Sequence, residues 1–284
     1  MLAARRRRGS TLILAYHNVV ADDAPPFGDR SLHLPLTQFR SQLDRLQETH
    51  DVVDVASVHS SPLKSDKPRV CFTFDDAYRG ALTLALPELV RRGIPATVFV
   101  APGLLGTAGC WWDRLASPDG GGLSPGVRDH VLNRLRGDSA AALAWARTQR
   151  MALAALPANA AIATEGELRA AAELPGITLG AHTWSHCNLA RVDESAFERE
   201  LVEPLAWLRE RFERVVPWLA YPYGLSGPDT ADWARRAGYQ GTLRIEGGWL
   251  SAASAVGLAL PRLNVPTGLS SDGFTLRASG LMSD

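Results

Sequence analysis

Two polar motifs, each directly after a short apolar run, constrain what this chain can fold into. The adjacent carboxylates Asp75 and Asp76 follow the run 70–74, and His182 and His186 follow the run 177–181. Both runs are rich in β-branched or aromatic residues, which is typical of buried strands. Because α/β barrels carry their chemistry at the C-terminal ends of parallel strands, the sequence predicts an α/β barrel with both motifs at one mouth.

Polar side chains also follow the other predicted strands. The segments 11–15, 215–220 and 256–263 have the same strand-like pattern. Just past them, or at their ends, stand His17, Tyr223, Arg262 and Asn264. In a parallel barrel these ends meet, so we expect these side chains to gather around the two motifs.

Residues 103–176 interrupt the alternation of strands and helices. Helical patterns at 126–136, 139–156 and 165–174 indicate a helical insertion over one face of the barrel, not a separate domain. We therefore expect a basic tail over 1–10, followed by a single barrel domain over 11–284.

Two helices carry features that the structure can test. The helix that follows the first strand is expected to be capped by Thr37. A later helix, from about Ser195, contains Pro204, which should remove one backbone hydrogen bond and bend it.

Composition excludes several classes of protein. In 284 residues, the 30 lysines and arginines balance the 30 aspartates and glutamates, so no global charge favours nucleic acid. Three cysteines without C-x-x-C spacing require no oxidising compartment. The apolar run after Arg5–Arg8 is too short for a signal peptide, and no stretch reaches the length of a membrane span. We expect a cytoplasmic protein whose arginine-rich tail can contact an anionic membrane surface.

The two motifs together predict a metal site. One carboxylate and two histidines make a three-ligand site for a divalent metal with room for water, and the other carboxylate is free to act as a base. Taken alone, adjacent acids can simply cap a helix, and an H-x-x-x-H pair is more often a pair of surface or core histidines. Two neighbouring carboxylates repel each other, however, and a cation between them relieves that repulsion.

Residues 14–19, 70–78, 177–189 and 216–224 resemble the polysaccharide deacetylase family, the chitooligosaccharide deacetylase-like carbohydrate esterases. The resemblance implies a distorted (β/α)7–8 barrel with one divalent metal ion, usually Zn²⁺. It assigns the role of general base to Asp75 and the metal ligands to Asp76, His182 and His186. It also implies that the backbone N–H of Tyr223 helps to hold an oxyanion.

Three positions depart from the family pattern. Ala77 replaces a glycine, which matters only if this residue needs a positive φ, and Ala220 replaces the arginine that orients the base. The last strand also lacks the family's acid histidine. We hypothesise that Arg262 positions Asp75 and that His17 is the acid, although a hydrogen-bonded core histidine explains His17 equally well.

Aromatic residues point to a carbohydrate partner, because aromatic faces suit the apolar faces of sugar rings. We expect Trp184, Tyr221 and Trp112 to contact the substrate. The resulting hypothesis is a zinc-dependent hydrolase that removes N-acetyl groups from a sugar of a polysaccharide or its biosynthetic precursor. O-deacetylation, deformylation and a carbohydrate-binding pseudoenzyme stay open as alternatives.

Overall fold

Seven parallel strands close into a barrel in the computed structural model, which describes residues 9–59, 65–117, 122–250 and 259–281. The strands are β1 (Thr11–Tyr16), β5 (Arg69–Asp75), β6 (Ala96–Val100), β7 (Ile177–Ala181), β8 (Val215–Ala220), β9 (Gly241–Ile245) and β11 (Ala259–Asn264). Each pairs with the next in this order, and β1 closes the ring by pairing with both β5 and β11. The predicted α/β barrel is therefore confirmed.

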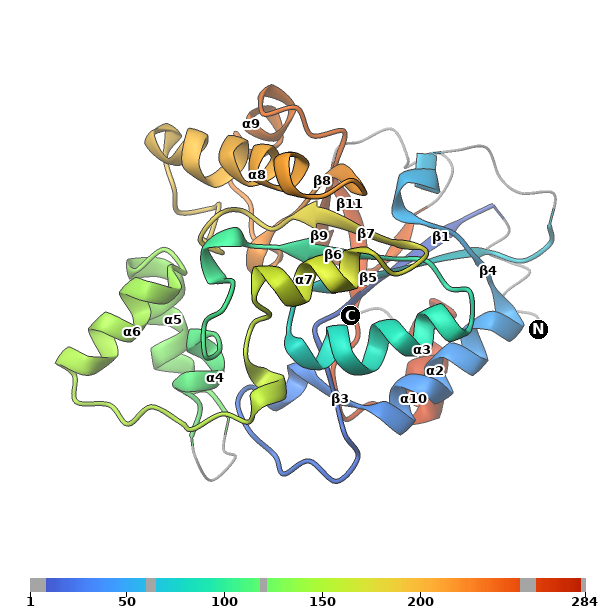
Figure 1. Ribbon diagram of the computed structural model, residues 1–284, viewed down its shortest axis with the longest axis horizontal. Coiled ribbons are helices and arrows are strands. Elements are labelled where there is room, and N and C mark those ends of the chain that lie inside the picture. Colours follow the sequence, from blue (N-terminus) through green and yellow to red (C-terminus); the bar gives the residue numbers. More distant parts are fainter. Residues whose placement is uncertain (1–8, 60–64, 118–121, 251–258, 282–284) are drawn as a thin grey trace.

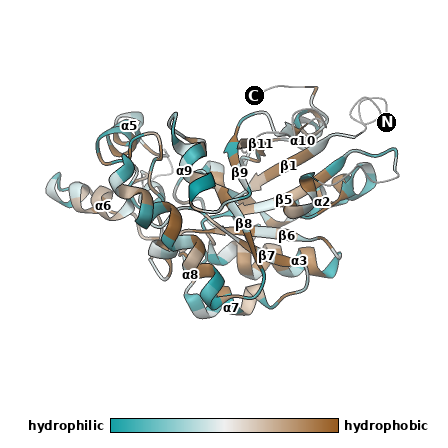
Figure 2. Ribbon diagram, turned by 90° about the horizontal axis from the view of Figure 1, so that it is seen from above, coloured by the Kyte–Doolittle hydropathy of each residue, from teal (hydrophilic) through white to brown (hydrophobic). Residues whose placement is uncertain are grey.

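Burial on both faces explains why these segments read as continuous apolar runs. Every residue of β1, β5 and β6 is buried, as expected for parallel strands covered by helices. Hydropathy colouring shows apolar strands inside and polar helix surfaces outside (Figure 2). The sequence reading missed the short strands β2 (Asn18–Val20), β3 (His33–Pro35) and β10 (Trp249–Leu250). Strand β4 (Asp51–Val52) is also short, and a 3-10 turn begins at Val55.

Helices surround the barrel (Figure 1). They are α2 (Leu36–Thr49), α3 (Leu86–Arg91), α7 (Glu165–Ala172), α8 (Glu203–Arg211), α9 (Thr230–Arg236) and α10 (Ser271–Ala278). The expected cap of α2 is wrong: the helix follows Pro35 without a side-chain cap. The hydroxyl and backbone N–H of Thr37 bond instead to the Asp22 carboxylate, which draws Thr37 away from capping.

Prolines stand where two helical segments change geometry, and one of these segments is the predicted helix that contains Pro204. Pro204 lies in the first turn of α8, and the preceding residues Glu198–Val202 are π-helical. Pro87 stands in the same position in α3, after a π-helical turn over Ala81–Ala85. Proline has no N–H to donate to a helical hydrogen bond. In both segments the π-helical turn therefore gives way to an α-helix at the proline, in whose first turn no such bond is needed.

The insertion forms a group of helices at one side of the barrel (Figure 1). It contains α4 (Trp111–Arg114), α5 (Pro125–Arg134) and α6 (Ser139–Thr148). The helix predicted over 139–156 is too long, because the chain leaves α6 and turns through Arg150 at φ +55°. Helix α7 packs against β7 and so belongs to the ring of barrel helices rather than to the insertion.

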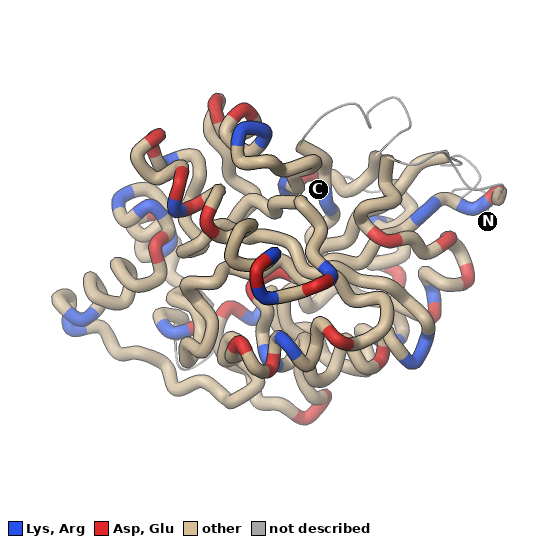
Figure 3. Tube along the Cα trace, turned by 45° about the horizontal axis from the view of Figure 1, so that its top comes forward, with Lys and Arg blue, Asp and Glu red and all other residues tan. Residues whose placement is uncertain are grey.

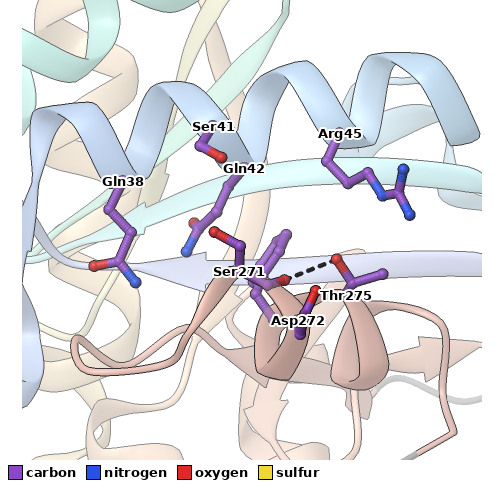
Figure 4. A pocket seen from close by; sticks show the side chains of 8 residues that line it. Gln38, Ser41, Gln42, Arg45, Ser271, Asp272 and Thr275 are labelled. Atoms are coloured by element: carbon purple, nitrogen blue, oxygen red, sulfur yellow. Dashed lines mark hydrogen bonds between the residues drawn. The ribbon is translucent and has the colours of Figure 1, made fainter.

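Helix α10, which the sequence reading did not include, packs beside α2 (Figure 4). A groove of about 300 Å³ with polar walls separates the two helices. Below it, the buried Gln42 accepts a hydrogen bond of 2.9 Å from the Tyr16 hydroxyl and so ties α2 to β1. Acidic and basic residues are interspersed along the described chain (Figure 3). Across these described ranges, every helix is too short or too polar to span a bilayer.

Candidate active site

The end of β5 carries the first charged pair of the site. Asp75 is its last residue, and both carboxylate oxygens accept hydrogen bonds of 2.7 Å from the guanidinium of Arg262 on β11. Arg262 is fully buried and also donates to the Thr73 hydroxyl at 3.0 Å. Burial alone would raise the pKa of Asp75, but the guanidinium, and then His182, hold that pKa well below its usual range. Asp75 is therefore ionised at neutral pH.

Asp76, His182 and His186 converge beside this pair. Their ligand atoms lie within 4.8 Å of one another, and all three residues are buried. Asp76 Oδ1 is 3.6 Å from His182 Nε2 and 3.1 Å from His186 Nε2. The three residues that the sequence indicated as metal ligands, here called the metal triad, thus come together from the ends of two strands, β5 and β7, in an arrangement that could hold a metal ion.

The tautomer of His182 is set by its backbone neighbour. Its Nδ1 lies 2.8 Å from the carbonyl oxygen of Ala220, which can only accept, so Nδ1 carries the proton. The lone pair of Nε2 then faces Asp76. Burial lowers the pKa of His182 to about 4, against the opposing attraction of Asp75, so the ring is neutral at pH 7. A neutral imidazole with a carbonyl behind it is the usual form of a metal-binding histidine.

The donor set at this point fits a cation. Asp76 Oδ1 and His186 Nδ1 are buried without a hydrogen-bond partner in the described part of the chain. A neutral Nε2 offers a lone pair and not a proton, so His182 cannot satisfy the Asp76 oxygen. Unpaired buried polar atoms are costly unless something compensates them. One oxygen and two imidazole nitrogens form a ligand set typical of Zn²⁺ with an open position.

Glu200, which sequence reasoning missed, holds the loop between the two histidines. Its buried carboxylate accepts the backbone N–H groups of Trp184 and Ser185 at 3.1 and 2.9 Å and the Ser185 hydroxyl at 2.9 Å. It lies in the π-helical turn before α8. The available signal was an acid beside the apolar stripe of that helix, a position that charged residues usually avoid unless paired.

The turn after β8 presents Tyr223 to the site. Tyr223 has φ +59°, and the hydrogen bonds inside this turn are donated by Gly224 and Leu225. Gly224 itself has a positive φ, and a Cβ there would lie 2.9 Å from the Ile245 side chain. The Tyr223 hydroxyl donates to the Gly137 carbonyl and accepts from the Trp111 indole, each at 2.8 Å. The turn is therefore anchored to the insertion.

Left-handed backbone is concentrated at the site. Ala77, which replaces the glycine of the family pattern, has φ +55°, so this departure does place an L-residue in a strained conformation. Positive φ values also occur at Asp76, Thr183 and His186. Such residues persist only where surrounding contacts fix them, and they cluster at functional sites.

A cavity of about 330 Å³ opens over these groups. The lining includes Asp75, the three clustered residues Asp76, His182 and His186, and also His17, Asn264, Trp112 and Tyr223. The Trp112 ring lies 4.8 Å from the ring of His186. Sequence reasoning also missed Asp29 and Arg128, which form an ion pair at 2.5 Å in the cavity wall.

The structure places two predicted substrate contacts elsewhere. Tyr221 is 1% exposed and lies outside the cavity lining, because its backbone N–H continues the strand pairing to Leu243. Trp184 packs against Gly103, where a Cβ would come within 3.1 Å of its ring. Neither of these two residues is among those that line the cavity, and their contact with substrate stays a prediction.

Comparisons with known proteins point to one family. The family model of polysaccharide deacetylase matches residues 63–242. The putative polysaccharide deacetylase YxkH of Bacillus subtilis (strain 168) is 21% identical over 266 residues, covering 92% of this chain and 74% of its own length.

Solved structures share the fold. The deacetylase PplD of Streptococcus pyogenes, solved in complex with acetate, superposes with a TM-score of 0.64 at 18% identity, covering 94% of this chain and 97% of PplD. IcaB of Ammonifex degensii gives 0.59 at 17% identity, covering 96% and 98%. Since the family model covers more than half of the sequence, this chain belongs to the polysaccharide deacetylase family.

Proposed function

We propose that this protein is a metal-dependent deacetylase that hydrolyses the N-acetyl group of an amino sugar in a polysaccharide or in its biosynthetic precursor. The observation that carries the proposal is the buried triad of Asp76, His182 and His186 beside the ionised Asp75. Family membership supports deacetylation of a carbohydrate. The choice of N-acetyl over other acyl groups is part of the proposal.

Asp76, His182 and His186 would hold a divalent cation, for which Zn²⁺ fits the ligand types best. Such a cation polarises a carbonyl oxygen and lowers the pKa of bound water. The carbonyl of Ala220 keeps His182 in the ligating tautomer. Glu200 fixes the backbone between the two histidines.

Asp75 acts as the general base. It removes a proton from the attacking water as the water oxygen bonds to the acetyl carbon. Arg262 holds both oxygens of the carboxylate and so fixes its orientation during this transfer. Arg262 touches Asp75 and not the substrate, and its role is that of a positioning residue.

Tyr223 and His17 complete the reaction by stabilising the oxyanion and protonating the leaving group. The backbone N–H of Tyr223 donates to the oxyanion that develops on the acetyl oxygen, a contribution of about 3–4 kcal/mol for a well-placed donor. His17 follows β1, lines the cavity and is the acid that protonates the sugar nitrogen. The C–N bond then breaks, and acetate and a free amine leave.

Acetate release from N-acetylated oligosaccharides tests the proposal. Wild type, His182→Ala and Asp75→Asn are each assayed after metal removal, with and without added zinc. Zinc-dependent release that both substitutions abolish is the expected result. O-acetylated and N-formylated sugars in parallel assays identify the preferred acyl group. No release from any of them by the zinc-loaded wild type would refute the hydrolase, and sugar retention without turnover would identify a binding protein.

A further inference from the structure

Three consecutive side chains of the one-turn helix α4 each reach a different segment of the site. Trp111 donates its indole N–H to the Tyr223 hydroxyl at 2.8 Å. Trp112 donates to the Tyr78 hydroxyl, also at 2.8 Å. Tyr78 stands two residues after the metal-triad residue Asp76 on the same loop. The two indoles therefore join α4 to the loop after β5 and to the turn after β8.

Asp113, the third of these side chains, is fully buried and receives three hydrogen bonds. Its Oδ1 accepts from His33 Nε2 at 3.0 Å and from the Asp29 backbone N–H at 2.9 Å. Its Oδ2 accepts from the Tyr78 hydroxyl at 2.7 Å. The two oxygens of one buried carboxyl group therefore accept from three different segments of the chain.

The directions of these bonds are consistent through the whole network. His33 Nδ1 lies 3.1 Å from the Asn18 amide nitrogen, a donor, so the ring proton is on Nε2, facing Asp113. Tyr78 accepts from Trp112 and donates to Asp113.

Gly28 gives independent evidence that the chain is built around this carboxylate. A Cβ at Gly28 would lie 2.2 Å from Asp113 Oδ1, and the residue has φ +56°. Only glycine combines that conformation with so close an approach. The N-terminal loop, the insertion and the loop after β5 thus meet at Asp113.

The network ends at groups that the proposed chemistry uses. Trp112 lines the cavity with its ring against His186, and Tyr223 is the residue whose backbone N–H is assigned to the oxyanion. A shift of α4 would move both the cavity wall and the Tyr223 turn. Mutation of residues that support a metal site from outside typically lowers activity or metal affinity by about 10–100-fold.

We propose that Asp113 is a positioning residue of this site. By holding α4, it fixes Trp112 against His186 and, through Trp111, the turn of Tyr223. The inference rests on the proposed deacetylase function for its effect on turnover, but the placement of Trp112 can be measured separately.

Asp113→Asn is the first variant, because it keeps the shape of the side chain and replaces one acceptor oxygen by an NH₂ donor. Whichever way the new amide faces, its NH₂ group meets a donor: either Tyr78, or the pair His33 and Asp29. We expect kcat to fall by about 10–100-fold. KM should change less, because Asp113 itself is not among the residues that line the cavity. Assays run well below each variant's unfolding midpoint keep the folded fraction constant.

Solvent exchange of the Trp112 indole N–H gives a readout that does not depend on activity. In ¹⁵N-labelled protein its signal is assigned by its loss in Trp112→Phe. We expect slow exchange in wild type and faster exchange in both Asp113→Asn and Tyr78→Phe. Unchanged exchange in Asp113→Asn would overturn the inference, even if turnover fell.

A double variant separates positioning from general destabilisation. If Asp113 acts through Tyr78, Asp113→Asn combined with Tyr78→Phe should lower kcat little further than Asp113→Asn alone. Losses that multiply would contradict the proposed route.

The matched control is Asp138→Ala in the same insertion. Asp138 caps α6 by accepting from the Ala141 N–H. Its loss should lower the unfolding midpoint while kcat and indole exchange stay at wild-type values. Wild-type kcat in Asp113→Asn would refute the positioning role. If wild type itself releases no acetate, the proposed function fails, and indole exchange still decides whether Asp113 holds Trp112.

Discussion

Replacing Arg262 by methionine removes the charge that compensates a buried carboxylate. Arg262 is fully buried and makes two bonds of 2.7 Å to Asp75, which is 1% exposed. Breaking a buried ion pair by removing one partner costs about 3–5 kcal/mol, because the remaining charge is left unsolvated. For a chain of this size, we expect the unfolding midpoint to fall by about 6 °C or more.

The same substitution should change the pH dependence of both stability and activity. In wild type the pKa of Asp75 is depressed, so its stabilising effect is full above the unfolded value of about 4 and is lost as the pH falls further. Without Arg262, burial raises that pKa. The stability difference between the two proteins should therefore narrow as the pH falls. The acid limb of kcat/KM should move to higher pH, because the base must be ionised to work.

Thermal unfolding and pH–rate profiles test this reasoning together with two further variants. Asp75→Asn combined with Arg262→Met replaces the ion pair by neutral groups and should recover most of the lost stability, but no activity. Arg244→Met is the matched control, since Arg244 is 42% exposed and pairs with Glu246 at the surface, where an ion pair contributes up to about 1 kcal/mol. A wild-type midpoint and an unshifted acid limb in Arg262→Met would refute the argument.

Three further predictions concern the metal triad and its supports. Zinc at about 100 times its Kd should stabilise wild type by about 2.7 kcal/mol in thermal unfolding. Zinc should stabilise His182→Ala far less than wild type. Equal stabilisation of the two proteins would exclude His182 as a ligand. Glu200→Gln should weaken zinc binding by about 10–100-fold in a metal titration, because the loop between the histidines loses its carboxylate; unchanged affinity would show that the loop holds itself. Ala77→Gly relieves about 1–2 kcal/mol of left-handed strain. The substitution also lowers stability by about 0.5–1 kcal/mol through the greater backbone entropy of unfolded glycine, and by about 0.8 kcal/mol through the loss of a buried methyl group. Denaturant unfolding should therefore change by less than about 1 kcal/mol, and a larger loss would mean that the methyl packs more tightly than this estimate allows.

The strands and the convergence of the motifs were predictable because the signals are local. The segments 177–181 and 215–220 were predicted with the bounds that the structure has. A parallel barrel then brings strand ends together by topology alone, and no side-chain detail is needed to place His182 near Asp76.

Contacts distant in sequence were not predictable in the same way. Glu200 and Asp113 act through partners on other segments, and the sequence does not indicate which segments those are. Trp184 lies outside the cavity lining for a related reason. Positive φ at Thr183 and His186 redirects the loop, and the sequence pattern does not indicate which side chains then face the cavity.

The position of Arg262 shows how a departure from a family pattern can be compensated by the fold. Family resemblance places an arginine next to the Pro-Tyr-Gly segment, where this chain has Ala220 at the end of β8. The inside of a closed barrel can be reached from any of its strands. Because β11 lies beside β1, and β1 beside β5, a guanidinium from β11 reaches the carboxylate at the end of β5. Ala220 keeps its carbonyl on His182, a contact that needs no side chain. We therefore expect an arginine introduced at position 220 to lower activity, because its guanidinium would compete with Arg262 for Asp75, and an acetate-release assay of Ala220→Arg with and without Arg262→Met would test this. If the double variant is more active than Ala220→Arg and more active than Arg262→Met, positions 220 and 262 are interchangeable sources of the positive charge beside Asp75. If both single variants and the double variant are inactive, only an arginine on β11 can supply that charge.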